Sequence, residues 1–227
     1  MDMLDVDLPH KTIDGVGEFF LHLFTITVGL LIAVGIEAAV ERHQRRELAS
    51  EARDTMTAEI RKNSGSVADA LKEIDQEQQK LKRNLAEVRE VQLDPKSSSS
   101  QSANLDIGFN TTGLEDTGWR TAQATGALAF MPYAESEKYT GIYRVEEDFL
   151  KNQDQLSDDE ARILGIVQKF HVGEGNLTKE AADAMAEQFG ICQGHLLALK
   201  IGARVLQEQQ SAFLEGREPK HNMSESL

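Results

Sequence analysis

The sequence predicts an all-α protein with one N-terminal transmembrane helix, followed by a helical bundle that contains two long heptad-patterned helices. Three observations lead to this prediction. Residues 19–36 form an uncharged apolar run. Two later stretches carry apolar residues at alternating steps of four and three. Proline is scarce, with 4 among 227 residues, and aromatic residues make up only 6%, which disfavours a β-sandwich.

The apolar run, FFLHLFTITVGLLIAVGI, is long enough to cross a bilayer. As a helix its 18 residues rise about 27 Å, close to the roughly 30 Å of a hydrocarbon core. The predicted transmembrane helix covers residues 18–41, after a short polar N-terminus at 1–17. A signal peptide and a buried core helix are the competing interpretations. No basic region precedes the run and no A-x-A site follows it, and such a run is uncommon in soluble domains.

Basic residues are distributed unevenly around this run. Lys11 alone precedes it, whereas Arg42, Arg45, Arg46 and Arg53 follow it. The positive-inside rule places the more basic flank in the cytoplasm. We therefore expect a single-pass protein whose C-terminal domain is cytoplasmic, with the opposite orientation as the alternative.

The charge balance limits the partners. The net charge is −14, and a surface of that sign repels the phosphates of nucleic acid. The single cysteine, Cys192, excludes an intrachain disulfide. Small residues recur as Gly29-x-x-x-Ala33, a spacing that permits close helix contact. The expected partners are the lipid bilayer and a second copy of the chain, and not nucleic acid.

Residues 42–95 are predicted to form a long helix. Its heptad seam begins at Val67, and the helix should end before Pro95. The small polar residues around Gly65 predict a break or kink near 63–66. Residues 96–116 are expected to form a mobile serine-rich loop. The seam positions are Val67, Leu71, Ile74, Gln78, Leu81, Leu85 and Val88.

A helical domain is expected at 117–216, followed by a polar tail at 217–227. We predict a short helix over 118–130, a second helix from Pro132 and a third from Ser157, where Ser157-Asp-Asp-Glu160 matches a capping box. The last helix should cover 178–215. Its stripe holds Met185, Phe189, Cys192, Leu196, Leu199, Ala203, Leu206, Gln210 and Phe213, in alternating steps of four and three.

Motifs for chemistry are missing from the sequence. There is no Walker loop, no G-x-S-x-G elbow and no complete dinucleotide loop. Cys192 and His195 could bind a metal together, but two ligands are too few for a structural zinc site. We therefore predict no catalytic, cofactor-binding or metal-binding residues, and favour a protein that is not an enzyme.

One stretch could still line a ligand pocket. Residues 119–143 hold the only tryptophan and all three tyrosines, and aromatic side chains with a few polar groups are typical of binding sites. They are equally typical of a core onto which short helices pack. The candidate pocket residues are Trp119, Arg120, Tyr133, Glu135 and Tyr139.

Two stretches, HKTIDGVGEFFLHLFTITVGLLIAVGIEAAVERH with EARDTMTAEIRKN, and TGALAFMPYAESEKYTGIY, resemble an uncharacterised group of bacterial proteins with one N-terminal span and a helical domain. The resemblance covers about half of the chain and implies a bacterial membrane protein without assigning an activity. We expect its location to be the bacterial inner membrane. The functional hypothesis is a membrane-anchored interaction or scaffold protein. The alternative is a membrane-tethered enzyme or ligand-binding protein with its site near 119–143.

Overall fold

The protein is all-α, as predicted. The computed structural model describes residues 15–97, 105–173 and 177–220, and no β-strand occurs among them. The helices are α1 (Val16–Leu93), α3 (Thr117–Thr125), the 3-10 helix η1 (Ala127–Phe130), α4 (Tyr133–Phe170) and α5 (Lys179–Leu214). The chain divides into two compact units, Met1–Ser50 and Glu51–Leu227.

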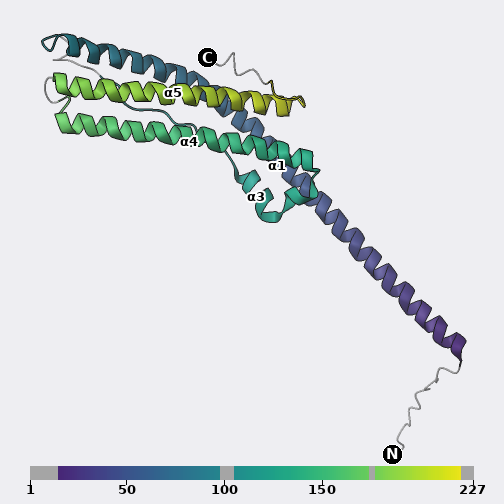
Figure 1. The fold of residues 1–227 in the computed structure, drawn as a ribbon. Helices are drawn as coiled ribbons and strands as arrows, with labels where there is room; N and C mark the ends of the chain where they lie inside the picture. The colour runs from purple at the N-terminus through teal and green to yellow at the C-terminus, as the bar shows by residue number, and fades with distance from the viewer. Residues whose placement is uncertain (1–14, 98–104, 174–176, 221–227) are drawn as a thin grey trace, which may run out of the picture. The chain divides into compact units, whose positions relative to one another are not determined.

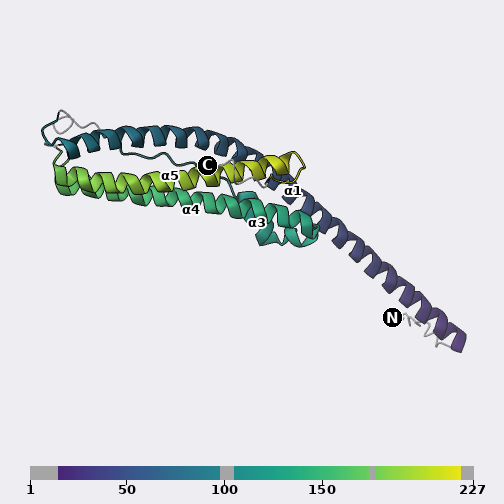
Figure 2. The same cartoon turned by 45° about the horizontal axis from the view of Figure 1, so that its top comes forward.

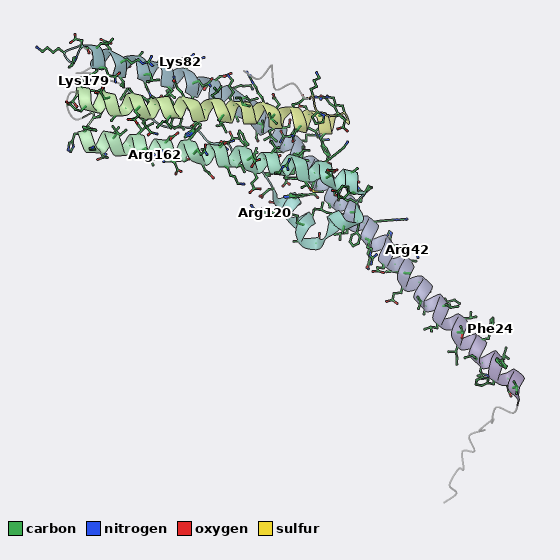
Figure 3. The ribbon with its side chains drawn as sticks, viewed as in Figure 1. Phe24, Arg42, Lys82, Arg120, Arg162 and Lys179 are labelled. Atoms are coloured by element: carbon green, nitrogen blue, oxygen red, sulfur yellow. The ribbon has the colours of Figure 1, made fainter. Side chains whose placement is uncertain are left out.

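The first unit contains the apolar part of α1. An 18-residue window of this helix has a mean hydropathy of 2.3, none of it is buried within the protein, and its length and composition suffice to cross a membrane. Side chains such as Phe24 project outward from the helix (Figure 3). The hydroxyls of Thr25 and Thr27 donate to carbonyls one turn back, so these polar groups are satisfied inside the helix.

The second unit is a three-helix bundle of residues 51–93 of α1 with α4 and α5. In both views α4 and α5 lie side by side, and α1 runs along them (Figures 1 and 2). Helices α1 and α4 point in the same direction and α5 runs antiparallel to both. The core contains most positions of the predicted seams, whose largest fully buried members include Leu81, Phe189, Leu196 and Leu206. In α1 the predicted seam positions Leu71 and Gln78 are only half-buried, and Ala70 and Glu77 are buried instead.

Residues 105–116 return the chain from the end of α1 to the start of α3. This return segment is extended, and its apolar side chains alternate with exposed ones and pack on the core at Leu105, Ile107 and Phe109. Gln153 of α4 both donates to and accepts from the backbone of Thr112 (2.9 and 2.7 Å). The prediction of a mobile loop is therefore wrong for 105–116, and residues 98–104 lie outside the described part.

The predicted break at 63–66 is absent: α1 continues through these residues. The Asn63 side chain is 1% exposed and holds the backbone of Glu115 through two bonds, from Nδ2 to the carbonyl (2.7 Å) and from the Glu115 N–H to Oδ1 (2.9 Å). A glycine in a helix costs only about 1 kcal/mol. These tertiary bonds and the flanking core residues outweigh that local preference.

The helix predicted to start at Ser157 is also not separate, since α4 runs unbroken from Tyr133 to Phe170. The third residue of the capping pattern, Asp159, is fully buried and accepts from Gln188 of α5 (2.9 Å). Its side chain is therefore engaged in the bundle instead of at a helix start.

The predicted helix over 118–130 ends early. Gly126 adopts a left-handed conformation (φ 71°) that closes α3 at Thr125, and η1 follows. Glycine takes this conformation without the Cβ strain that other residues meet, which favours it after a helix end. The last helix matches its predicted stripe: every position from Met185 to Gln210 is buried, and only Phe213 is partly exposed.

Candidate functional site

The five candidate pocket residues do not converge on one cavity. The Tyr133 side chain is 81% exposed, and Arg120 points into solvent, where it pairs with Asp116 of its own turn (Figure 3). Glu135 accepts from Arg53 of α1 in a two-bond ion pair (2.5 and 3.0 Å). Tyr133 and Arg120 therefore stand on the surface, apart from the buried aromatic residues.

The other two residues take part in aromatic packing: Tyr139 is buried, and Trp119 is half-buried. The ring of Trp119 stacks on Tyr143 of α4 (centroids 4.9 Å apart, 12° between planes). Tyr139 is 3% exposed, its hydroxyl bonds to the Thr57 hydroxyl (3.0 Å), and its ring meets Phe213 edge-on at 5.0 Å. These aromatic residues thus hold α3, α4 and α5 against α1. The contacts favour the packing interpretation of residues 119–143 over the ligand pocket.

Beside these rings, Glu59 of α1 closes the N-terminus of α3. The first N–H groups of a helix have no partner inside it. Here Glu59 accepts from the N–H of Gly118 (3.0 Å) and of Trp119 (3.3 Å), while Asp116, the N-cap residue, makes no side-chain cap bond. A carboxylate is favoured at this end of the helix dipole. Glu59 therefore fixes α3 on the bundle.

Glu59 is also part of a buried polar network that crosses the bundle. The Tyr143 hydroxyl donates to Glu59 at 2.6 Å. One turn on, Glu146 accepts from Asn63 of α1 (3.1 Å) and from Gln210 of α5 (2.8 Å). All five residues are at most 7% exposed. We call this set the polar network: Glu59, Asn63, Tyr143, Glu146 and Gln210.

Burial changes the protonation of two members of the polar network. Loss of solvation raises the pKa of Glu146 to about 7, against the opposing effect of the Gln210 and Asn63 bonds, and the nearby Glu59 and Asp116 charges raise it further. Desolvation also raises the pKa of Tyr143, so its phenol stays a donor to Glu59. The Gln210 carbonyl oxygen is buried and has no partner.

A second buried carboxylate lies on the α4–α5 contact. Asp159 accepts from Gln188 and bonds to Nδ1 of His195 at 2.6 Å. Burial raises the pKa of the neighbouring Cys192 thiol to about 12, and the Asp159 charge adds to the effect. The thiol is therefore neutral near pH 7, which disfavours a nucleophile. In a Cys-His-Asp triad the histidine would stand between the other two residues, whereas here the carboxylate does.

A small hollow of about 200 Å³ opens at the end of the bundle that contains Phe213. Its lining is largely apolar, with charged groups at its rim, of which Lys138 and Glu218 pair at 3.2 Å. None of the five candidate pocket residues lines it. The lining residues are Lys138, Gly141, Ile142, Gln209, Phe213, Arg217, Glu218 and Pro219.

Sequence reasoning missed the polar network, although a signal was present. Asn63 precedes Val67 by four residues, and Glu146 and Gln153 stand between Tyr143 and Leu156 at helical spacing. Polar residues that occupy the core face of a helix must find partners when the helix is buried.

Among the described residues, no group of three or more His, Cys, Asp or Glu is arranged to hold a metal ion. The polar network is instead suited to holding helices together, because its hydrogen bonds join α1, α4 and α5. Comparison with known proteins adds no assignment: no family model, no curated protein and no solved structure matches the chain.

Proposed function

We propose that this chain is a single-pass, membrane-anchored helical interaction or scaffold protein of the bacterial inner membrane. Residues 18–41 are its anchor, and residues 51–227 form a helical domain in the cytoplasm. The bacterial setting rests on the resemblance of its N-terminal stretch, and the orientation rests on the excess of arginine after the anchor.

The observation that carries the proposal is the exposed apolar surface of the first unit. Between Phe19 and Ile36 the large apolar side chains other than Val28 are about half exposed or more, and no charged side chain interrupts them. Leaving such a side chain in water costs about 1.5–3 kcal/mol relative to burial. A bilayer removes this cost along the apolar run of residues 19–36. The exposed set is Phe19, Phe20, Leu21, Leu23, Phe24, Ile26, Leu30, Leu31, Ile32, Val34 and Ile36.

An interaction role for the helical domain is supported by how its polar groups are used. The buried carboxylates Glu59, Glu146 and Asp159 accept bonds from neighbouring helices, as a structural network requires. A catalytic pair would instead present one such group to a cavity that admits substrate. The hollow near Phe213 is lined by none of these three.

Membrane extraction tests the anchor. The wild-type chain should stay in the membrane fraction after high salt and after alkaline carbonate, because burial of apolar surface does not depend on charge. The double variant Leu30→Lys/Leu31→Lys should be released, since each lysine at the centre of a span costs about 2.5–3.5 kcal/mol. The matched control Leu30→Ile/Leu31→Ile should remain bound. Release of the wild-type chain by carbonate would contradict the anchor.

The intact mass of the membrane-bound chain separates an anchor from a signal sequence. An anchor stays on the mature chain, so the full mass of 25.2 kDa should be recovered. A chain shortened by removal of the apolar segment would favour a cleaved signal. For orientation, a C-terminal fluorescent-protein fusion should be bright and an alkaline phosphatase fusion silent, and the reverse result would invert the topology.

A further inference from the structure

The turns of α1 that follow the apolar run carry their positive charge on one side of the helix. Arg45 and Arg46 follow Arg42 by three and four positions, so at 100° per residue the three arginines share an arc of about 100°. Glu37 and Glu47 fall on the other side of the helix. We call the basic residues the arginine face: Arg42, Arg45 and Arg46.

Two members of the arginine face have no side-chain partner within the described part of the chain. All three arginines are exposed, and Arg45 pairs with Glu41 one turn back, whereas Arg42 and Arg46 make no side-chain hydrogen bond or ion pair to a described residue. The sequence gives the reason, because the positions three and four residues away from each hold only alanine, serine, histidine or arginine. Arg42 and Arg46 also stand four positions apart, where like charges repel. An anion held between them would remove this repulsion.

The position of the arginine face along α1 matches the headgroup layer of a bilayer. The apolar run ends at Ile36, and with a rise of about 1.5 Å per residue Arg42 and Arg46 lie about 9 and 15 Å beyond it. Helix side chains lean toward the N-terminus, so each guanidinium reaches back by up to about one turn, roughly 5 Å. The headgroup layer is about 5–8 Å thick on each side of the hydrocarbon core. Arg42 therefore reaches the phosphates directly, and Arg46 lies at their outer edge.

Small residues precede the arginine face on the same side of α1. Ala38 and Ala39 stand one turn before Arg42, and Gly35 precedes them by about a further turn. A Cβ at Gly35 would have nothing within 4 Å in the chain. Small side chains allow a neighbour to approach the backbone of a helix closely. This side of α1 thus offers open apolar surface at the depth of acyl chains and positive charge at the depth of phosphates.

The chemistry of arginine favours an anionic lipid as the partner. A guanidinium is permanently charged, and its paired N–H donors match two oxygens of one phosphate. Cβ atoms four positions apart on a helix are about 5–6 Å apart, so Arg42 and Arg46 can donate to the same phosphodiester. The ammonium group of a zwitterionic lipid competes for that phosphate, whereas a headgroup with an uncharged alcohol leaves its whole negative charge to the protein.

We propose that Arg42 and Arg46 bind the headgroup phosphate of an anionic phospholipid, such as phosphatidylglycerol, in the leaflet at the C-terminal end of the anchor. The inference rests on the membrane anchor proposed above and names the class of lipid that lies beside it. The contact fixes the depth at which α1 leaves the bilayer, because the two arginines meet phosphates at one height only.

The lipid preference of the full chain tests the inference. The chain is reconstituted in phosphatidylcholine vesicles that contain a trace of spin-labelled phosphatidylglycerol or spin-labelled phosphatidylcholine. Electron paramagnetic resonance then measures the share of each label that is held beside the protein. Wild type should hold the phosphatidylglycerol label about twofold or more in excess of the phosphatidylcholine label. One arginine contributes a factor of about five at its own contact, and the measurement averages over all lipids around α1.

Two matched variants locate the preference. Arg42→Gln/Arg46→Gln should bring the ratio of the two labels close to one. Arg83→Gln/Arg89→Gln removes the same charge from exposed positions later in α1 and should keep the wild-type ratio. A wild-type ratio near one would overturn the inference, and so would an Arg42→Gln/Arg46→Gln chain that keeps the wild-type preference.

Salt tests the nature of the contact. Raising the salt from about 0.1 M to about 1 M shortens the Debye length from about 10 Å to about 3 Å, so the wild-type preference should fall toward one. A preference for phosphatidylglycerol that does not change with salt would contradict a contact between guanidinium and phosphate.

Energy transfer between two labelled populations in the same vesicles identifies a different occupant. If Glu37 and Glu47 of a second copy cover the arginine face, wild type transfers energy, Arg42→Gln/Arg46→Gln does not, and neither shows a lipid preference. That result would overturn the lipid contact.

Carbonate extraction separates the headgroup contact from the anchor. Arg42→Gln/Arg46→Gln should stay in the membrane fraction, because burial of the apolar run does not depend on charge. A wild-type chain that stays in the membrane without any lipid preference would lack the headgroup contact alone. A wild-type chain that carbonate releases would lack the anchor, and the headgroup contact with it.

Discussion

The two ends of the bundle achieve burial by different means. Around Leu196 and Leu199 the three helices meet through aliphatic side chains, and their stabilisation comes from apolar surface removed from water. Around Glu146 the same three helices meet through the polar network, whose members need one another as partners. The apolar end gains stability in proportion to what it buries, whereas the polar end mainly specifies which side chains meet.

The largest expected effect lies at the apolar end. Leu199 is 2% exposed in the middle of α5. Its truncation in Leu199→Ala removes apolar contacts and leaves a cavity, which costs about 2–5 kcal/mol. Urea unfolding of the detergent-solubilised chain, followed by circular dichroism, should show a clear loss in the free energy of unfolding. A loss below about 1 kcal/mol would contradict the tightly packed core.

The polar end should respond to pH. The folded state holds the Glu146 pKa at about 7 and the unfolded state near 4.5, so between these values the folded chain binds the extra proton. This contribution to stability is full below the unfolded pKa and is lost as pH rises through the folded pKa, a loss of about 3 kcal/mol.

Glu146→Gln isolates this contribution, because an amide keeps the shape of the carboxyl group and does not titrate. The variant should exceed wild type in unfolding free energy by about 2–3 kcal/mol at about pH 8, and the difference should shrink at about pH 5. The measurement is urea unfolding of both chains across this range. A difference in unfolding free energy that stays constant with pH would show that titration of Glu146 does not contribute to stability.

The junction between Glu59 and α3 should tolerate little added volume. A Cβ at Gly118 would lie 2.9 Å from a Thr55 methyl carbon and 3.1 Å from Oε2 of Glu59. Gly118→Ala should therefore cost about 1–3 kcal/mol through displacement of these groups, despite the better helix propensity of alanine. Gly141→Ala is the control, since its Cβ position is open within a helix. Equal melting temperatures for Gly118→Ala and Gly141→Ala would contradict this prediction, because they would show that the Glu59 side chain moves aside without a cost in stability.

The smallest effect is expected at Lys200. It pairs with Asp75 of α1, which is itself half exposed, and its amine also donates to Gln78 at 3.3 Å. An ion pair in contact with solvent contributes about 0–1 kcal/mol. Lys200→Ala should thus lower unfolding stability far less than Leu199→Ala next to it. Comparable losses of unfolding free energy from Lys200→Ala and Leu199→Ala would mean that burial of the seam residues is not the main source of stability in this part of the bundle.

Periodicity predicted the apolar end of the bundle better than the polar end. The stripe of α5 and most of the seam of α1 follow from spacing alone, because an aliphatic side chain has the same preference in any helical core. The polar network depends on pairs such as Glu59 with Tyr143, whose partners stand 84 positions apart. Its residues mark a buried polar face only after the helices that surround it are known.

Local signals failed where tertiary contacts opposed them. The glycine at position 65 and the capping box at Ser157 predict helix ends, yet Asn63 and Asp159, both buried by other helices, hold the helices through these points. The candidate pocket failed for a related reason. Aromatic residues close in sequence, such as Tyr133 and Tyr139, were distributed by α4 to the surface and the core.

The parallel course of α1 and α4 sets the order in which partners become available during synthesis. The α4–α5 hairpin joins residues about one helix apart, such as Asp159 and His195, whereas Gln78 of α1 waits for Lys200, 122 positions later. At about 5–20 residues per second, α5 is completed roughly 6–25 s after α1. Throughout that interval the α1 seam lacks its α5 partners, so its apolar side chains stay open to contact with neighbouring chains on the same message.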